Sequence, residues 1–208
     1  MEYLGSFITI GMISVLAAMS PGPDFIVVAK NSLLGSKRVG IYTAFGVSSG
    51  ILLHVTYSLF GIGLIISQSI LIFALIKYLG ALYLFYLGYQ LLKTESSQGT
   101  KFGDEKIATI TFYKSFKEGF LTNALNPKVT LFFLSIFTQT VDPNTPFSIQ
   151  IMLGLEVALI VGIWFIALTL IITYEPTKLL FSKFHYYLMK IMGATLLLLS
   201  IKLALTTT

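Results

Sequence analysis

Cysteine is absent from this 208-residue sequence, and charged residues make up only 11% of it. Without cysteine the chain can form no disulfide, no thiolate metal site and no thiol–disulfide relay. A soluble domain usually contains about 25% charged residues, so this chain has too few to cover a surface that faces water. The composition therefore excludes a secreted domain, a soluble enzyme and a disordered tail.

Hydrophobic residues, by contrast, make up 55% of the sequence and occur in long blocks. A helix needs about 20 apolar residues to cross a bilayer, so six spans would use about 120 residues. No basic segment precedes the first block, so we expect it to remain as a span and not to be cleaved as a signal peptide. The sequence thus predicts an all-α polytopic membrane protein of six transmembrane helices. The six blocks are Leu4–Ala29, Val39–Ile66, Ile70–Leu92, Gly119–Val141, Phe147–Tyr174 and Tyr187–Leu205.

Lysine and arginine are concentrated in alternate loops between these blocks. Three, including Lys30, follow the first block, five lie within Lys93–Lys117 and two lie around Lys178, whereas the breaks at Ser67 and Asp142 contain none. Basic loops remain in the cytoplasm, so this alternation predicts that both termini lie outside. The rule also accounts for the net charge of +5. Because the basic residues form no continuous stripe, we expect no nucleic-acid partner.

A hydrophilic linker at residues 96–116 divides the chain into two halves of three spans each, residues 1–95 and 117–208. Because three is an odd number, the second half enters the membrane from the opposite side, and related halves would form an inverted-topology repeat. The segment Lys77–Ala81 in the third block is similar to Lys190–Ala194 in the sixth. This similarity favours two inverted three-helix repeats.

Prolines interrupt the first and fourth apolar blocks. The first block contains Pro21, Gly22 and Pro23, and the fourth contains Pro127 at the corresponding place. Proline has no amide hydrogen and clashes with the preceding turn, so each helix is expected to open there. An opened helix survives in a bilayer only where protein or a wet cavity covers its free backbone groups. Paired breaks in corresponding spans are typical of a transporter binding site.

An ionisable residue follows each break, Asp24 after the first and Lys128 after the second. If the two halves are related, this carboxylate and this ammonium face one cavity, and a zwitterionic amino acid is complementary to both. Asn123 and Asn126 would add neutral hydrogen bonds beside the second break. In a second interpretation, Asp24 only caps the half-helix and pairs with Lys128. The two interpretations are compatible, because a substrate can displace an internal pair.

Three motifs resemble those of a known family, the lysine exporter and homoserine–threonine resistance (LysE/RhtB) amino-acid exporters. They are Ser20–Asp24 in the first block, Leu79–Gly88 in the third and Gly119–Lys128 in the fourth. The motifs occur in the family's order, and the resemblance covers nearly the whole chain. It implies a bacterial cytoplasmic-membrane protein that exports amino acids or their derivatives, driven by the proton gradient. No ATP-binding loop of the form G-x-x-x-x-G-K-[ST] is found, which agrees with a secondary transporter.

Two further ionisable residues lie inside the apolar blocks. His54 lies near the middle of the second block and Glu156 about ten residues into the fifth. Both are candidates for proton coupling. Alternatively, His54 only hydrogen-bonds a neighbouring helix, and Glu156 lies close enough to the membrane surface to reach lipid headgroups.

Other functions find less support. Gly46–Gly50 formally matches the G-x-S-x-G pattern of hydrolases, but that motif needs a strand–turn–helix setting, and paired glycines favour close helix packing. A divalent or other inorganic cation exporter is the alternative function, yet it would need several carboxylates or histidines together inside the membrane. We therefore expect no enzyme activity, cofactor or metal. The expected partners are a small amino-acid substrate and the bilayer, and the glycine faces leave a homo-oligomer open.

Overall fold

The computed structural model describes residues 3–20, 22–60, 70–93, 112–126, 128–130, 132–133 and 145–205. Within these ranges the chain is helical and contains no strand, which confirms the all-α class. The main helices are α1 (Leu4–Met19), α2 (Pro23–Leu34), α3 (Lys37–Leu59), α5 (Ile70–Leu92), α6 (Phe112–Ala124), α8 (Phe147–Thr173) and α9 (Glu175–Leu205).

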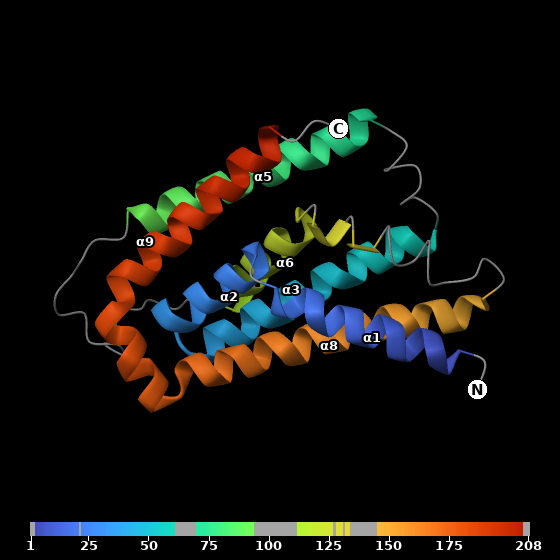
Figure 1. The fold of residues 1–208 in the computed structure, drawn as a ribbon, viewed down its shortest axis with the longest axis horizontal. Helices are drawn as coiled ribbons and strands as arrows, with labels where there is room; N and C mark the ends of the chain where they lie inside the picture. Colours follow the sequence, from blue (N-terminus) through green and yellow to red (C-terminus); the bar gives the residue numbers. More distant parts are fainter. Residues whose placement is uncertain are drawn as a thin grey trace.

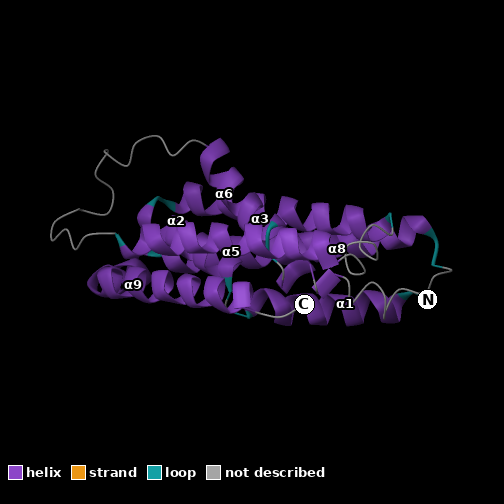
Figure 2. Cartoon of the chain, turned by 90° about the horizontal axis from the view of Figure 1, so that it is seen from above, coloured by secondary structure: helices purple, strands orange, loops and turns teal. Residues whose placement is uncertain are grey.

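The helices form two groups (Figures 1 and 2). In the larger group, α3 packs along both α6 and α8, α1 lies along α8, and α2 contacts α3, α6 and α8. In the other group α5 and α9 pack along each other, and they contact the remaining helices over shorter stretches. The helices next to the proline breaks, α2 and α6, therefore lie side by side inside the larger group.

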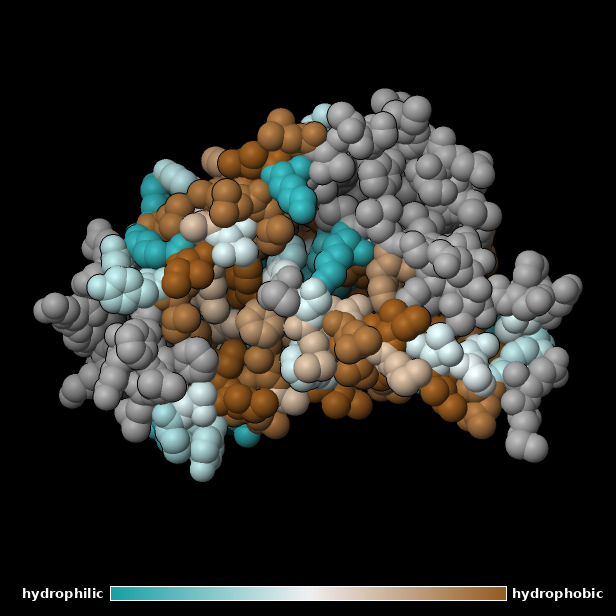
Figure 3. Space-filling model, viewed as in Figure 1, coloured by the Kyte–Doolittle hydropathy of each residue, from teal (hydrophilic) through white to brown (hydrophobic). Residues whose placement is uncertain are grey.

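The outer surface is strongly apolar, as expected for helices in lipid. Brown hydrophobic residues cover most of the coloured surface in Figure 3. Along α1 the exposed large side chains recur every third or fourth residue, and α8 carries a similar exposed row. An apolar surface of this extent is rare on a soluble monomer. The exposed residues of α1 are Leu4, Ile8, Met12, Ile13, Val15, Leu16 and Met19.

Among the described residues, α3 and α8 are each long and apolar enough to cross a membrane alone, and α1 and α2 qualify together as one bent span. The structure therefore contains two or three candidate spans within the residues it describes. The six-span inverted repeat and the outside position of both termini stay predictions.

Helices α6 and α9 begin well before the apolar blocks that predict them. Helix α9 begins at Glu175, although the last apolar block begins at Tyr187, and α6 begins at Phe112 inside the predicted linker. Proline is favourable in the first helical turn, and from Pro176 onward no glycine or further proline interrupts the chain before Gly193. Hydropathy locates the apolar part of a helix, whereas the helix itself continues until a residue breaks it.

Glycines allow α3 and α6 to approach closely. A Cβ atom on Gly46 would lie 2.1 Å from the backbone oxygen of Phe116, and a Cβ on Gly119 would lie 2.2 Å from that of Thr43. Both contacts are far shorter than any side chain tolerates, so each glycine is required by its neighbour. The expected packing role of the Gly46–Gly50 segment is confirmed, and the segment lies within one continuous helix.

Candidate functional site

The first break separates α1 from α2. The two helices are inclined by 58° to each other. Gly22 is the N-cap residue, and Pro23 occupies the first turn of α2, where its missing amide hydrogen leaves no bond unmade. Asp24 also lies in this first turn, where the helix dipole favours a negative charge. Pro21 lies outside the described residues.

The second break follows α6 and forms a turn around Asn126. The backbone oxygen of Asn126 accepts hydrogen bonds from the amides of Val129 and Thr130, at 3.0 and 3.1 Å. The Asn126 side-chain oxygen accepts a further bond from the Lys128 amide at 3.1 Å. Asn126 thus caps a new helical turn that begins at Lys128. Pro127 lies outside the described residues.

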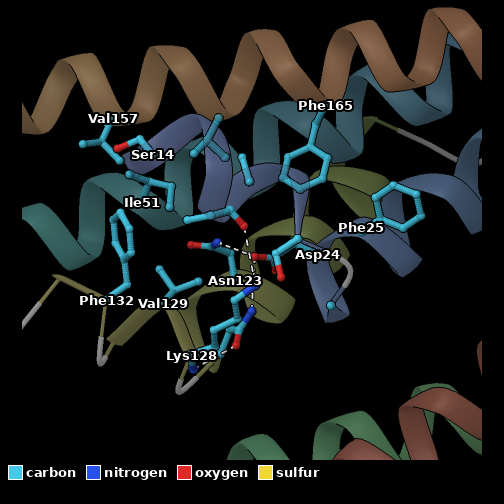
Figure 4. Close-up of a pocket in the computed structure, with 16 residues that line it drawn as sticks. Ser14, Asp24, Phe25, Ile51, Asn123, Lys128, Val129, Phe132, Val157 and Phe165 are labelled. Carbon is cyan, nitrogen blue, oxygen red and sulfur yellow. Dashed lines mark hydrogen bonds between the residues drawn. The ribbon is translucent and has the colours of Figure 1, made fainter. Parts of the chain in front are cut away.

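The two breaks meet at the carboxylate of Asp24. Its Oδ2 atom accepts hydrogen bonds from the side-chain amide of Asn123 at 2.9 Å and from that of Asn126 at 3.2 Å. Its Oδ1 atom is buried and finds no hydrogen-bond partner among the described residues. Figure 4 shows this arrangement, with the Asn123 amide directed at Asp24. Residues about 100 positions apart in the sequence are thereby brought together.

Lys128 does not pair with Asp24. Its ammonium group donates a long hydrogen bond, 3.5 Å, to the backbone oxygen of Ala17 at the end of α1. Within the described part of the chain, Asp24 and Lys128 form no ion pair with each other. The second interpretation, in which Lys128 pairs with Asp24, is therefore wrong: the two asparagine amides stabilise the carboxylate instead.

A cavity of about 60 Å³ lies between the two breaks and the middle of α3 and α8 (Figure 4). One water needs about 10–15 Å³ of such space, so the cavity can hold several water molecules or part of a small ligand. Asp24, Asn123, Asn126 and Lys128 all line it. The remaining wall is mostly apolar and includes Ile51, Phe132, Val157, Val161 and Phe165.

His54 and Glu156 lie in different surroundings. His54 is fully buried, its Nε2 lies 3.0 Å from the backbone oxygen of Asn123, and its Nδ1 contacts the Tyr57 hydroxyl. Glu156 faces Gly11 of α1 and lies outside the set of residues that line the cavity. Its Oε2 atom is buried without a hydrogen-bond partner among the described residues. Asp24, Asn123 and Asn126 together form the Asp24 cluster. The structure therefore connects His54, but not Glu156, to this cluster.

The sequence analysis missed a second polar contact between α2 and α6. Glu118 forms an ion pair with Lys30, and its Oε2 accepts a hydrogen bond from the Asn31 amide at 2.9 Å. From the sequence, Lys30 is assigned only to a basic loop, and Glu118 is not among the candidate residues. Glu118 precedes Asn123 by five residues and Lys30 follows Asp24 by six. This matched spacing on two antiparallel helices was the available signal.

Metal-binding geometry is not found in the part of the chain that the structure describes. No three His, Cys, Asp or Glu side chains come together there. Among the described residues, the cavity is lined by one carboxylate, that of Asp24, and by one lysine, Lys128. A cation is repelled by the lysine, so this donor set does not favour an inorganic cation.

Comparison with known proteins assigns the chain to a family of translocators. The chain matches the LysE type translocator family over residues 15–207. It is 31% identical over 201 residues to the uncharacterized membrane protein YrhP of Bacillus subtilis (strain 168), a match that covers 93% of this chain and 96% of the relative.

Two other relatives are named for what they transport. The chain is 32% identical over 139 residues to the threonine efflux protein of Escherichia coli (strain K12), covering 66% of this chain and 68% of the relative. It is 31% identical over 135 residues to the leucine efflux protein of Salmonella choleraesuis (strain SC-B67), covering 64% and 62%. No solved structure matches the chain significantly. Because the family match extends over nearly the whole sequence, this protein belongs to the LysE type translocator family.

Proposed function

We propose that this protein exports neutral amino acids, or small derivatives of them, from the cytoplasm across the bacterial inner membrane. Membership of the translocator family and the similarity to threonine and leucine efflux proteins support this function. The proposed substrate site is the cavity between the two helix breaks. Asp24, Asn123, Asn126 and Lys128 would contact the substrate there.

One observation carries the proposal: the cavity holds an anion and a cation that do not pair with each other. Asp24 keeps its Oδ1 atom without a hydrogen-bond partner among the described residues, and Lys128 donates a long bond of 3.5 Å to a backbone oxygen. A buried carboxylate oxygen without a partner is unfavourable. The α-ammonium group of an amino acid would supply the missing donor to Asp24, and its carboxylate would accept from Lys128.

The remaining wall favours an uncharged substrate side chain. A lysine-like or arginine-like side chain would need a second carboxylate, and Asp24 is the one carboxylate among the residues that line the cavity. The wall formed by α3 and α8 presents Ile51, Val157, Val161 and Phe165. Burying an apolar side chain against these residues is favourable, by about 25 cal/mol for each Å².

Transport would proceed by alternating access around this cavity. In the proposed architecture, six helices form two inverted repeats with both termini outside, and one half moves against the other about the broken helices. The break prolines would provide the hinge, since proline leaves the preceding backbone without a full set of helical hydrogen bonds. No catalytic step is required, and we propose no enzyme activity and no cofactor.

The driving force would be the proton gradient. His54 lies nearer the cavity, but Glu156 is the candidate for coupling that has a free oxygen among the described residues. Its Oε2 atom has no partner among the described residues, so it can accept a proton without breaking a hydrogen bond. Both nitrogens of His54 are already engaged. A Glu156→Gln variant should still exchange substrate across the membrane but should lose accumulation driven by an imposed proton gradient.

The function is tested by efflux from proteoliposomes loaded with radiolabelled threonine, leucine or lysine. Wild-type protein should release the neutral amino acids faster than lysine. The variants Asp24→Asn and Lys128→Gln should lose this release. Lys37→Gln, at the exposed first residue of α3, is the matched control and should behave like wild type. Equal release by Asp24→Asn, or transport of a divalent cation in place of amino acids, would contradict the proposal.

A further inference from the structure

The hydrogen bonds of His54 define its protonation form. Its Nε2 atom lies 3.0 Å from the backbone oxygen of Asn123, and a carbonyl oxygen only accepts hydrogen bonds. Nε2 must therefore carry the hydrogen. Nδ1 then accepts from the Tyr57 hydroxyl, its other partner. His54 is fully buried, and its ring stacks on that of Phe133 with the centroids 5.8 Å apart, so the imidazole has no room to turn over.

The carbonyl that His54 contacts lacks its regular α-helical partner. In an α-helix the carbonyl of residue 123 would accept from the amide of residue 127. Position 127 is a proline, which has no amide hydrogen. The Asn126 amide bonds this oxygen at 2.9 Å in a tight turn, and His54 supplies a second donor. An imidazole from α3 thus takes the place of the amide that the proline lacks.

The same residue of α6 carries the side chain that binds Asp24. The Asn123 amide donates to Asp24 Oδ2 at 2.9 Å. On α3, one turn before His54, Gly50 leaves space for the Asn123 side chain, since a Cβ atom on Gly50 would lie 2.6 Å from Asn123 Oδ1. Helix α3 therefore holds Asn123 at two points, the backbone through His54 and the side chain through Gly50.

We infer that His54 is a positioning residue for the substrate site: it holds the broken end of α6 so that Asn123 orients Asp24 toward the cavity. This inference rests on the proposed function, because it assigns His54 a role in binding the exported amino acid. It gives His54 a structural hydrogen-bond role in place of proton coupling. The exported substrate would never touch His54 itself.

The test compares two substitutions of His54 that differ in their ability to donate. His54→Gln keeps an N–H donor at about the position of Nε2, whereas His54→Leu keeps the bulk and removes the donor. One hydrogen bond contributes about 0.5–1.5 kcal/mol, so His54→Leu should raise the KM for efflux by up to about tenfold. His54→Gln should stay within about threefold of wild type, with an unchanged ratio of protons to substrate. Thr56→Val, at an exposed position of the same helix, is the matched control.

Three results would overturn the inference. They are an equal rise of KM in both His54 variants, an unchanged KM in His54→Leu, and a loss of proton coupling in His54→Gln at normal substrate affinity. These results count against His54 alone when Asp24→Asn still abolishes efflux. If wild-type protein releases no amino acid, the proposed function itself fails.

A measurement on wild-type protein keeps the inference testable even if His54→Leu does not fold. The chain contains two histidines, His54 and His185, so nitrogen-15 NMR of labelled protein in detergent resolves both, and His185→Gln identifies the His54 signals. We expect the neutral form with hydrogen on Nε2. Hydrogen on Nδ1 would contradict the hydrogen bond to Asn123 and with it the inference.

Discussion

Helices α2 and α6 contact each other through two polar clusters that contain the same kinds of groups but differ in pairing. At the broken ends, Asp24 accepts from two asparagine amides on one oxygen and has no partner for the other among the described residues. The second cluster, the paired cluster, consists of Glu118, Lys30 and Asn31 and lies further along both helices. Here Glu118 uses both oxygens, one with Lys30 and one with the Asn31 amide. The first cluster lines the cavity and the second does not.

The two carboxylates therefore differ in that Asp24 has an oxygen without a partner among the described residues, whereas both oxygens of Glu118 join α2 to α6. The clusters are six residues apart on α2, which is about 9 Å along a helix. The paired cluster joins α2 to α6, and in the proposed function the Asp24 cluster would offer its unpaired oxygen to a substrate in the cavity. A fully paired carboxylate has little to gain from a ligand, whereas a partly paired one gains a hydrogen bond.

The largest effect is expected where both clusters depend on one contact. Substitution Gly46→Val would place a side chain where even a Cβ lies 2.1 Å from the Phe116 backbone oxygen, so α6 would have to move away from α3. We expect a loss of about 3 kcal/mol in the free energy of unfolding and loss of transport. Thermal unfolding in detergent measures the change. Gly5→Ala is the control, because nothing lies within 4 Å of a Cβ there, and it should not destabilise the protein. Equal stability of both variants would refute the close-packing argument.

The next largest effect is a loss of substrate affinity that should distinguish Asp24 from Glu118. Asp24→Asn removes the proposed charged partner of the substrate, and such hydrogen bonds contribute about 1.5–3 kcal/mol. Substrate affinity should therefore fall about ten- to a hundredfold. Glu118→Gln removes the same charge from the paired cluster and should leave affinity within about threefold of wild type. Binding of labelled leucine to purified protein measures both. A similar loss in the two variants would show that the clusters do not differ in function.

A smaller effect concerns stability in the paired cluster. The side chains of Lys30 and Glu118 are 13% and 19% exposed, so breaking their pair is less costly than breaking a fully buried one. We expect Lys30→Met to lower the free energy of unfolding by about 1–2 kcal/mol. The double variant Lys30→Met with Glu118→Met should recover much of this loss, since no unpaired charge remains. If the double variant is the less stable of the two, the pair contributes more than its desolvation removes.

The smallest effect should come from Tyr83→Phe. The Tyr83 hydroxyl of α5 donates to the backbone oxygen of Glu118 at 3.3 Å, a long hydrogen bond that should contribute about 0.5 kcal/mol. This hydrogen bond connects α5, which packs along α9, to Glu118 of the paired cluster. We expect a small fall in the unfolding temperature and unchanged substrate affinity. A change in affinity above about threefold would mean that α5 acts on the Asp24 cluster as well.

Much of this arrangement could be predicted from the sequence. The apolar blocks at Ile70–Leu92 and Phe147–Tyr174 match α5 and α8 to within one residue at each end, because hydrophobic length is a local property. The helix breaks near Pro23 and after Asn123 could also be predicted, since proline acts on its own turn. The extension of α9 back to Glu175 was missed, because a helix continues through polar residues that hydropathy assigns to a loop.

The pairing of the charged residues could not be predicted in the same way. In one interpretation of the sequence, Asp24 pairs with Lys128. In the structure Asp24 instead accepts hydrogen bonds from Asn123 and Asn126. An ion pair joins Lys30 to Glu118. Opposite charge is a necessary condition for a pair, and many combinations in the chain satisfy it. The distance between two helices selects among these combinations.

The sequence by itself determined that this is a helical protein of apolar blocks, that two of those blocks open at prolines, and that unlike charges follow the openings. These properties depend on residues within a few positions of one another. Only the tertiary structure decided which groups meet, because Asp24 and Asn123 are 99 residues apart. Their contact depends on how closely α6 approaches α3 at Gly46 and Gly119, and that approach brings His54 within reach of the Asn123 carbonyl.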